Sequence, residues 1–375
     1  MLRRDWLKTT AAAAAAAAFP FERLAEAAGV APGGAAKIST EVVRLNLRHT
    51  WTTTMSSSQY RDVLFVRYTR DGVTGVGEGA PIIRYHEDAL GAKKIVDGLA
   101  EFLSTANPFA FDKLNAEILR RVEGEWAAKA AIDIAIMDWV GQRLGLPIYR
   151  LLGLDPADAP QTTFSIGIDT PEITRQKVRE AEPYPLLKVK VGLDTDEPTI
   201  EAVRSVTKKT MRVDANEGWK DREIALKKIK WLETQGVEFI EQPLPAAMID
   251  DIRWLRERVN MPIIADEACL RPADIPQLAT AYDGVNIKLD KAGGILPAYR
   301  MIQIAKALGL KTMLGCMISS SCTVTAAAQL SPLVDYADLD CNLLIANDPF
   351  VGVTVVNGKL VLPDGPGLGL RPAST

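Results

Sequence analysis

The chain has 375 residues, of which 47% are hydrophobic and 24% are charged, and its formal net charge is −3. This composition is typical of a globular protein long enough for two domains. The charge is slightly negative and no basic patch stands out, so the composition argues against nucleic acid as a partner.

The first 28 residues differ from the rest of the chain. Arg3 and Arg4 precede an unbroken alanine run at 11–18, and small residues cluster at 25–28. A positive start, a short apolar core and small residues at a cleavage position are typical of a signal peptide, and the arginine pair resembles a twin-arginine export signal. The run is too short to span a bilayer. We therefore expect a signal peptide at 1–28 and an exported, periplasmic protein without membrane association after its removal. The alternative is an alanine-rich tail.

Strand patterns come first after this segment, and helical patterns follow. Apolar residues at 42–47, 63–68 and 74–78 predict three strands, with a turn at Asp71-Gly72 before the third. Helical periodicity then dominates 89–152. Strands followed by helices indicate a small α+β domain, which we place at 37–155.

A different rhythm, strand then helix, begins near residue 160. Alternating strands and helices predict parallel βαβ units, and eight strands over this length favour a closed barrel at 160–345. An open doubly wound sheet is the alternative, but no G-x-G-x-x-G turn follows the first strand. The final segment, 346–375, is expected to return to the first domain. The strand candidates are 163–168, 186–191, 211–213, 237–240, 262–265, 284–289, 312–315 and 336–339.

Charged residues recur at the ends of these barrel strands. Asp214, Glu241 and Asp266 follow one another at intervals of 27 and 25 residues, about one βα unit each. Active sites form at the carboxyl ends of barrel strands. A single carboxylate there is best explained as a helix cap or an ion-pair partner. Three on consecutive strands predict an oxygen-ligated site for Mg²⁺, with Mn²⁺ as the alternative.

Lysines flank this trio on both sides. Lys188 and Lys190 share one strand and point the same way, whereas Lys288 lies across the barrel. Nearby ammonium groups lower one another's pKa, so we expect one lysine with a pKa near neutrality that acts as a base. Bases on two opposite faces can invert a stereocentre. The alternative for a strand lysine, and part of the expected role of Lys188, is an ion pair with a ligand carboxylate.

The cysteines form no metal-binding pattern in the sequence. Because no C-x-x-C pair occurs, we expect buried free thiols and no cysteine metal site. The four are Cys269, Cys316, Cys322 and Cys341.

Five motifs in fixed order resemble those of the enolase superfamily, specifically its muconate-lactonizing subgroup. They are Lys-x-Lys at 188–190, Asp-Ala-Asn at 214–216, Glu-Gln-Pro at 241–243, Asp-Glu at 266–267 and Asn-Ile-Lys at 286–288. The resemblance extends over nearly the whole chain from Lys37. It implies a modified TIM barrel, (β/α)₇β, beneath an N-terminal α+β capping domain, and it implies a homo-oligomer.

The resemblance also assigns roles to residues. It implies metal binding by Asp214, Glu241 and Asp266, acid/base chemistry by Lys190 and Lys288 with Lys188 beside them, and supporting contacts from Asn216 and Gln242. The two histidines, His49 and His86, lie outside the barrel. That excludes the mandelate-racemase-like arrangement, which needs a barrel histidine.

The last barrel strand ends in Asp338-Leu339-Asp340. In dipeptide epimerases a similar Asp-x-Asp holds the α-ammonium group of the substrate. The resemblance therefore implies a dipeptide epimerase, which inverts the C-terminal residue by 1,1-proton transfer. The alternatives are an N-acylamino acid racemase, an o-succinylbenzoate synthase or, in a different class, an exported peptide-binding protein. A plain helix cap or solvated strand end is the simpler explanation of the two aspartates.

The first expectation for the substrate is L-Ala-D/L-Glu, a cell-wall dipeptide. In the best-known relatives an arginine of a capping-domain loop grips the glutamate side chain. Here that loop, 51–60, places serines at this position, of which Ser56 is the first. Arg61 and Arg84 are candidates for the missing arginine. If neither serves, the second residue of the dipeptide is not acidic.

Overall fold

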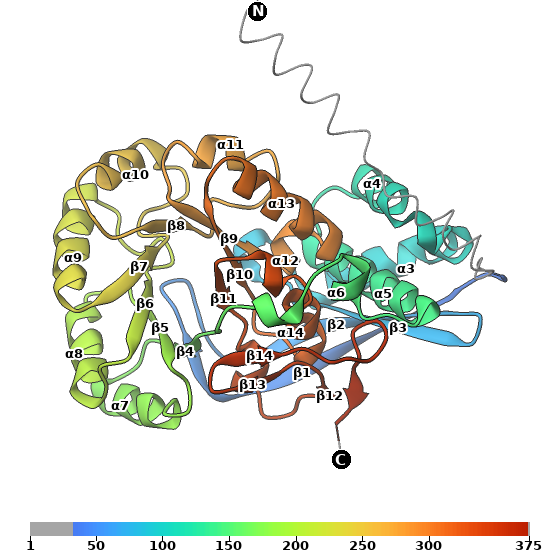
Figure 1. Ribbon diagram of the computed structural model, residues 1–375, viewed down its shortest axis with the longest axis horizontal. Coiled ribbons are helices and arrows are strands. Elements are labelled where there is room, and N and C mark those ends of the chain that lie inside the picture. Colours follow the sequence, from blue (N-terminus) through green and yellow to red (C-terminus); the bar gives the residue numbers. More distant parts are fainter. Residues whose placement is uncertain (1–32, 374–375) are drawn as a thin grey trace, which may run out of the picture.

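The computed structural model describes residues 33–373, so the expected signal peptide lies outside the described residues. The polypeptide forms a barrel, at left in Figure 1, and a smaller cap at right. The predicted fold class, a TIM-like barrel under an α+β cap, is confirmed. Within the described part of the chain, no helix is both long enough and apolar enough to cross a bilayer.

The cap is a three-stranded antiparallel sheet covered by helices. The strands are β1 (Lys37–Thr52), β2 (Ser57–Arg70) and β3 (Val73–Gly79), in the order β1-β2-β3. All three strands were predicted, although β1 and β2 are longer than the apolar patterns that predicted them. The helices of the cap are η1 (Ile83–Tyr85), α3 (Ala89–Thr105), η2 (Pro108–Ala110), α4 (Phe111–Arg121), α5 (Trp126–Leu144), α6 (Ile148–Leu151) and η3 (Pro156–Asp158).

A stripe of small residues lets β3 lie directly against α5. A Cβ atom added at Gly77 would meet the carbonyl oxygen of Ala131 at 2.0 Å, and Gly75 and Gly79 are similarly close to Ala135 and Ala127. The glycines are two residues apart on the strand, a rise of about 6.6 Å, and the alanines are four residues apart on the helix, a rise of about 6.0 Å. Because these spacings are nearly equal, each glycine lies opposite an alanine. Any larger side chain on this stripe would force the sheet and the helix apart.

The barrel is a sheet of eight parallel strands in sequence order, from β4 to β11. A bridge between Thr162 and Ala337 joins its first and last edges, and the hydroxyl of Thr162 accepts a hydrogen bond from Leu339 N (2.7 Å), so the barrel is closed. The strands are β4 (Phe164–Ile166), β5 (Leu186–Lys190), β6 (Thr210–Asp214), β7 (Val237–Glu241), β8 (Ile263–Ala265), β9 (Gly284–Lys288), β10 (Lys311–Gly315) and β11 (Tyr336–Asp338).

Helices on the outside of the barrel connect successive strands, as Figure 1 shows. Their inner faces and the strands form the largest apolar core of the protein. The connecting helices are α7 (Pro171–Glu180), α8 (Asp196–Val206), α9 (Arg222–Thr234), α10 (Ile249–Arg256), α11 (Ile275–Leu278), α12 (Leu289–Ala292), α13 (Ile295–Ala307), α14 (Ser321–Ala328) and η4 (Ser331–Leu333).

Buried carboxylates of the cap fasten it to the starts of barrel helices. Glu78, at the end of β3, accepts hydrogen bonds from Ser320 N (2.9 Å) and Thr323 N (3.0 Å) at the start of α14. Asp133 of α5 accepts from Ile295 N (2.6 Å) at the start of α13. Free N–H groups and the positive dipole end make a helix start a favourable partner for a carboxylate.

The C-terminal segment returns to the cap. Ala346 N donates to the carbonyl of Asn46 (2.8 Å) on β1, and the rings of Phe350 and Phe65 pack edge to face at 5.5 Å. The segment therefore joins the two parts a second time. It follows η5 (Cys341–Leu344) and contains β12 (Phe350–Val351), β13 (Thr354–Val356), β14 (Lys359–Val361) and β15 (Arg371–Pro372).

Candidate active site

Three carboxylates meet at the carboxyl ends of β6, β7 and β8. Asp214 and Glu241 end their strands, and Asp266 follows β8 by one residue. One oxygen from each lies within 4.8 Å of the other two, and all three side chains are buried. Parallel strands in register place their last residues at the same height, which is why residues so far apart in the chain converge.

Lysines contact this cluster from two sides. Lys190 Nζ lies 2.6 Å from Asp214 Oδ2, and Lys288 Nζ lies 2.7 Å from Asp266 Oδ2. Lys188 Nζ lies 2.8 Å from Glu241 Oε2. Because β6, β7 and β8 separate β5 from β9, Lys190 and Lys288 approach the cluster from opposite sides of the barrel mouth.

The expected lowering of a lysine pKa is wrong for Lys288 and Lys188. Burial lowers the pKa of Lys288, but Asp266, Glu241 and Glu267 together outweigh burial and the pKa stands well above its ordinary value. For Lys188 burial is likewise outweighed, here by Asp338, Glu241 and Asp214. That prediction rested on repulsion between lysines, whereas the ammonium groups of Lys188 and Lys288 each lie within 2.8 Å of a carboxylate oxygen.

Neighbouring side chains hold the three carboxylates in place. Asn216 donates to Asp214 Oδ2 (3.2 Å), and Gln242 Oε1 accepts from Asp266 N (3.0 Å). Both have left-handed backbone, with φ of 41° and 37°, which turns the chain sharply at the ends of β6 and β7. Asn286 donates to Glu241 Oε1 (2.7 Å), and Lys291 Nζ lies 2.5 Å from Asp266 Oδ1.

Asp338 and Asp340 form a second acidic pair beside the cluster. Both accept hydrogen bonds at Ser165 on β4, Asp338 from the hydroxyl (3.3 Å) and Asp340 from the amide N–H (2.5 Å). Burial raises the pKa of Asp338, but the ammonium group of Lys188 lowers it, and the pKa stands at about 2. Burial and the charge of Asp338 raise the pKa of Asp340 to about 7.

The residues present fit a divalent cation. The site places six buried carboxylates beside four buried lysines. Burial and the negative charge of Asp214 raise the pKa of Glu241 to about 7. Glu241 Oε2 contacts Lys188 but makes no hydrogen bond. Surplus negative charge and an all-oxygen donor set are what Mg²⁺ requires. The carboxylates are Asp214, Glu241, Asp266, Glu267, Asp338 and Asp340, and the lysines are 188, 190, 288 and 291.

A pocket of about 990 Å³, counting its open mouth, lies above Lys190 and Lys288 between barrel and cap. Ser56, Arg61 and Arg84 all line it. Arg84 is neutralised by Glu217, at 2.7 Å. In contrast, Arg61 Nε is buried without a hydrogen-bond partner, and among residues 33–373 no carboxylate lies within ion-pair distance of its guanidinium.

Of the serines expected in the loop, only Ser56 lines this pocket. Ser57 Oγ lies 2.9 Å from Thr52 Oγ1, and Ser58 Oγ donates to Tyr60 O (2.6 Å), so both are used within the hairpin.

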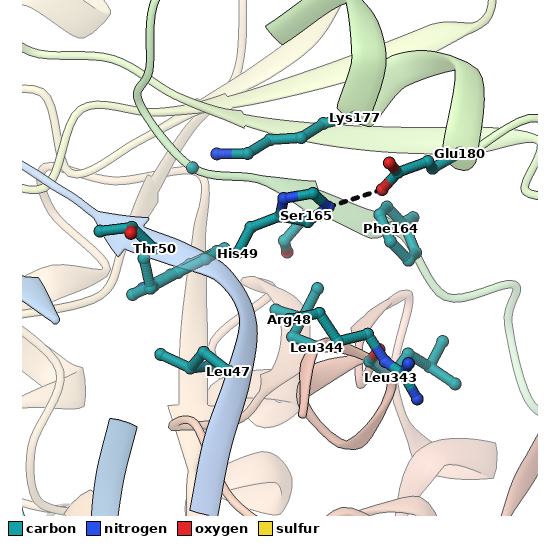
Figure 2. Close-up of a pocket in the computed structure, with 12 residues that line it drawn as sticks. Leu47, Arg48, His49, Thr50, Phe164, Ser165, Lys177, Glu180, Leu343 and Leu344 are labelled. Atoms are coloured by element: carbon teal, nitrogen blue, oxygen red, sulfur yellow. Dashed lines mark hydrogen bonds and ion pairs between the residues drawn. The ribbon is translucent and has the colours of Figure 1, made fainter. Parts of the chain in front are cut away.

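A smaller hollow of about 440 Å³ lies next to the substrate-sized pocket and shares Trp51 with it. Figure 2 shows its walls from β1, from β4 and α7, and from η5. His49 of β1 and Glu180 of α7 are joined across it at 2.7 Å. This hollow is lined neither by the three clustered carboxylates nor by Lys190 or Lys288. We therefore place the chemistry in the larger pocket.

Sequence reasoning gave no role to Asn286, Lys291 or Glu267. Asn286 and Glu267 lie inside motifs that were recognised, and Lys291 follows Lys288 by three residues. Asn286 could have been identified from its position, because it is a polar residue that points into the end of the barrel beside a predicted metal ligand. The contact between Lys291 and Asp266 depends on the helical turn that begins α12, which the sequence did not reveal.

Two family models together match most of the chain. Residues 37–153 match the model described as mandelate racemase / muconate lactonizing enzyme, N-terminal domain. Residues 173–374 match the model described as enolase C-terminal domain-like.

Individual proteins are similar over nearly their full length. An L-Ala-D/L-Glu epimerase of Bacteroides thetaiotaomicron is 44% identical over 90% of this chain and 88% of its own. The substrate-liganded L-Ala-D/L-Glu epimerase of Bacillus subtilis has a TM-score of 0.85 at 28% identity, covering 92% of this chain and 100% of its own. A dipeptide epimerase of Enterococcus faecalis V583, complexed with Mg and L-Leu-L-Tyr, has a TM-score of 0.84 at 31% identity, covering 90% and 99%.

Proposed function

The chain belongs to the mandelate racemase / muconate lactonizing enzyme family of the enolase superfamily and is a Mg²⁺-dependent dipeptide epimerase, and we propose that the residue it inverts is acidic. The single observation that carries the proposal on specificity is the Nε of half-buried Arg61, which is buried in the pocket wall without a hydrogen-bond partner.

The two lysines are the acid and the base of this proposal. Lys190 and Lys288 flank one volume from opposite sides, so one removes the α-proton of the C-terminal residue and the other returns a proton to the opposite face. Asp214, Glu241 and Asp266 would hold Mg²⁺, which would supply positive charge against the negative charge that develops at the substrate carboxylate. With their oxygens bound to the ion, these carboxylates would stabilise the lysine ammonium groups less, which would favour a neutral, basic amine.

The acidic pair on the last strand is the proposed ammonium subsite. Asp338 and Asp340 are buried and converge on Ser165, so they offer two carboxylates to a cation that enters from the pocket. The N-terminal amine of a dipeptide carries such a charge, whereas an N-acylated amino acid does not. This difference favours dipeptides over N-acylated amino acids as substrates.

Arg61 is the proposed reader of the acidic side chain. A buried Nε without a hydrogen-bond partner is costly for a charged group, and burial lowers the pKa of Arg61. An anionic ligand would relieve this cost with a charge-assisted, bidentate contact. Arg84 does not need such a ligand, because Glu217 already pairs with it. The name of the Bacteroides relative agrees with an acidic substrate, so L-Ala-D/L-Glu is the proposed pair.

The test compares L-Ala-L-Glu with its uncharged isostere L-Ala-L-Gln. We expect Arg61→Met to lower kcat/KM for the glutamate dipeptide by about 10- to 100-fold and to leave the glutamine dipeptide nearly unchanged. Arg61→Lys should retain part of the preference. Arg44→Met is the matched control, because Arg44 lies on the neighbouring strand and pairs with Asp62 outside the pocket. An unchanged glutamate-to-glutamine ratio in Arg61→Met would refute an acidic specificity through this residue.

Export remains part of the proposal and rests on residues 1–28 alone. The arginine pair and the alanine run support a twin-arginine route to the periplasm, where dipeptides from the cell wall are available. Cell fractionation of the full chain and of an Arg3→Lys, Arg4→Lys double variant tests it. Retention of both proteins in the cytoplasm would refute export.

Assembly into a homo-oligomer is likewise proposed, by the resemblance to the superfamily. Light scattering on the purified protein decides it, and a monomeric mass would refute it.

A further inference from the structure

Two thiols and a carboxylate meet in the wall of the substrate pocket. The sulfur atoms of Cys316 and Cys341 and a carboxylate oxygen of Asp340 all lie within 4.8 Å of one another. Both cysteines line the pocket and are nearly buried. Neither is in a disulfide.

The sheet register explains why residues so far apart in sequence meet. Cys316 directly follows β10 and Cys341 begins η5 shortly after β11, and these strands are neighbours with Gly315 opposite Asp338. Cys316 Sγ donates to the carbonyl of Asp338 (3.2 Å), which fixes the thiol at the end of β11. The spacing of the cysteines along the chain does not reveal this convergence, because it depends on the register between β10 and β11.

The chemistry of these donors differs from that of the Mg²⁺ cluster. Thiolates are soft ligands that select ions such as Zn²⁺ or Cd²⁺, whereas Mg²⁺ prefers oxygen alone. Two sulfurs and one carboxylate supply three ligands of a tetrahedral ion and leave one position for water. Asp338 adjoins Asp340 and adds negative charge to the site, whereas Lys188, which pairs with Asp338, and Arg61, near Cys341, add positive charge.

We infer that Cys316, Cys341 and Asp340 form a second cation site, selective for a thiophilic divalent ion, at which such an ion inhibits the enzyme. On binding, each thiol gives its proton to solvent and the two thiolates and the carboxylate bind the ion, with no change of oxidation state. The inference shares one element with the proposed function: Asp340 also belongs to the ammonium subsite. An ion there excludes the amine of the dipeptide, so inhibition is competitive with dipeptide.

Binding is tested first, without reference to activity. The full chain, saturated with Mg²⁺, is titrated with Cd²⁺, and the ultraviolet charge-transfer band of cadmium–thiolate bonds is followed. In the parent protein we expect the absorbance of this band to saturate at one equivalent of Cd²⁺. In Cys316→Ser and in Cys341→Ser we expect the band to be lost. Cys322→Ser is the control, because Cys322 is buried in α14 beside β3 and does not line the pocket. No band in the parent protein, or a band that survives both serine variants, overturns the site.

Inhibition is tested second, with each variant compared with its own rate without Zn²⁺. We expect the Zn²⁺ inhibition constant to rise by more than about tenfold in Cys316→Ser and Cys341→Ser, since even the loss of an outer partner has that effect on metal sites. Excess dipeptide should relieve the inhibition and excess Mg²⁺ should not. Relief by Mg²⁺ alone would place Zn²⁺ at the carboxylate cluster and overturn the inhibitory role. A protein that binds Cd²⁺ but epimerises no dipeptide would refute the proposed function and leave the thiol site standing.

Discussion

Lys188 joins the two acidic groups of the site: its Nζ lies 2.6 Å from Asp338 Oδ2 and also 2.8 Å from Glu241 Oε2. The same ammonium thus touches a proposed metal ligand and a proposed ligand of the substrate amine. A cation bound at either subsite weakens the ion pair between Lys188 and the carboxylate of that subsite. We therefore expect Mg²⁺ and dipeptide to influence each other's affinity through this lysine.

The ammonium subsite predicts a specific loss in Asp340→Asn. Removal of one charge from the subsite should raise KM for L-Ala-L-Glu by about tenfold or more, the effect of a hydrogen bond to a charged group. Steady-state kinetics with the dipeptide and with its N-acetyl derivative measure the effect. Because the acetylated compound has no ammonium group, its kcat/KM should change little. An equal loss for both compounds would contradict the assignment of Asp340.

Alanine variants of the two lysines should both lose epimerisation but should differ in the epimer whose α-proton they still exchange. Lys190→Ala and Lys288→Ala should each lower the rate of epimerisation by about 10²- to 10⁴-fold, the usual contribution of a general acid or base. In D₂O, each variant should still exchange the α-proton of one epimer, and the two variants should favour opposite epimers. Mass spectrometry and NMR detect the exchange. Identical exchange patterns in both variants would show that the lysines do not face opposite sides of the substrate.

Metal removal should abolish activity, and Mg²⁺ should restore it. We also expect Mg²⁺ to raise the melting temperature of the parent protein, because a ligand that binds only the folded state stabilises it. Glu241→Gln should lose most of this rise, since the amide offers no charge to the ion. Differential scanning calorimetry with and without Mg²⁺ makes the comparison. A variant that gains as much stability from Mg²⁺ as the parent protein would show that Glu241 is not a ligand of the ion.

Asp133 predicts a pH dependence of stability. Burial raises its pKa from 3.8 to about 7, so the folded protein retains a proton that the unfolded chain releases. Its contribution to stability is complete below pH 3.8 and is lost as the pH rises to about 7, by up to about 4 kcal/mol.

Asp133→Asn should flatten this part of the profile. An amide can still accept from Ile295 N, and it can donate to Asn115, whose Oδ1 is buried without a partner. Chemical denaturation at a series of pH values gives the free energy of unfolding of both proteins. A variant with the same slope between pH 4 and pH 7 would exclude Asp133 as the source.

The sequence sufficed for the barrel strands and for the carboxylates at their ends. Both depend on local periodicity and on the length of one βα unit, which a single chain displays directly. The pairing of Cys316 with Cys341 depends on the register between neighbouring strands. The choice between Arg61 and Arg84 depends on where Glu217 points, since that carboxylate neutralises one arginine and not the other. The lysine pKa values depend on distances to five carboxylates, which no spacing rule supplies.

The tip of the β1–β2 hairpin, which carries Ser56, rests on the barrel through Thr54, whose hydroxyl donates to the carbonyl of Asn216 (2.6 Å). That contact uses a main-chain atom of the barrel. The joints that hold the cap, at Glu78 and Asp133, lie elsewhere and involve none of the tip residues. Side chains on the tip other than that of Thr54 are therefore free to vary without loosening the union of the two domains. Substrate choice can drift over generations while the architecture that performs the inversion stays intact.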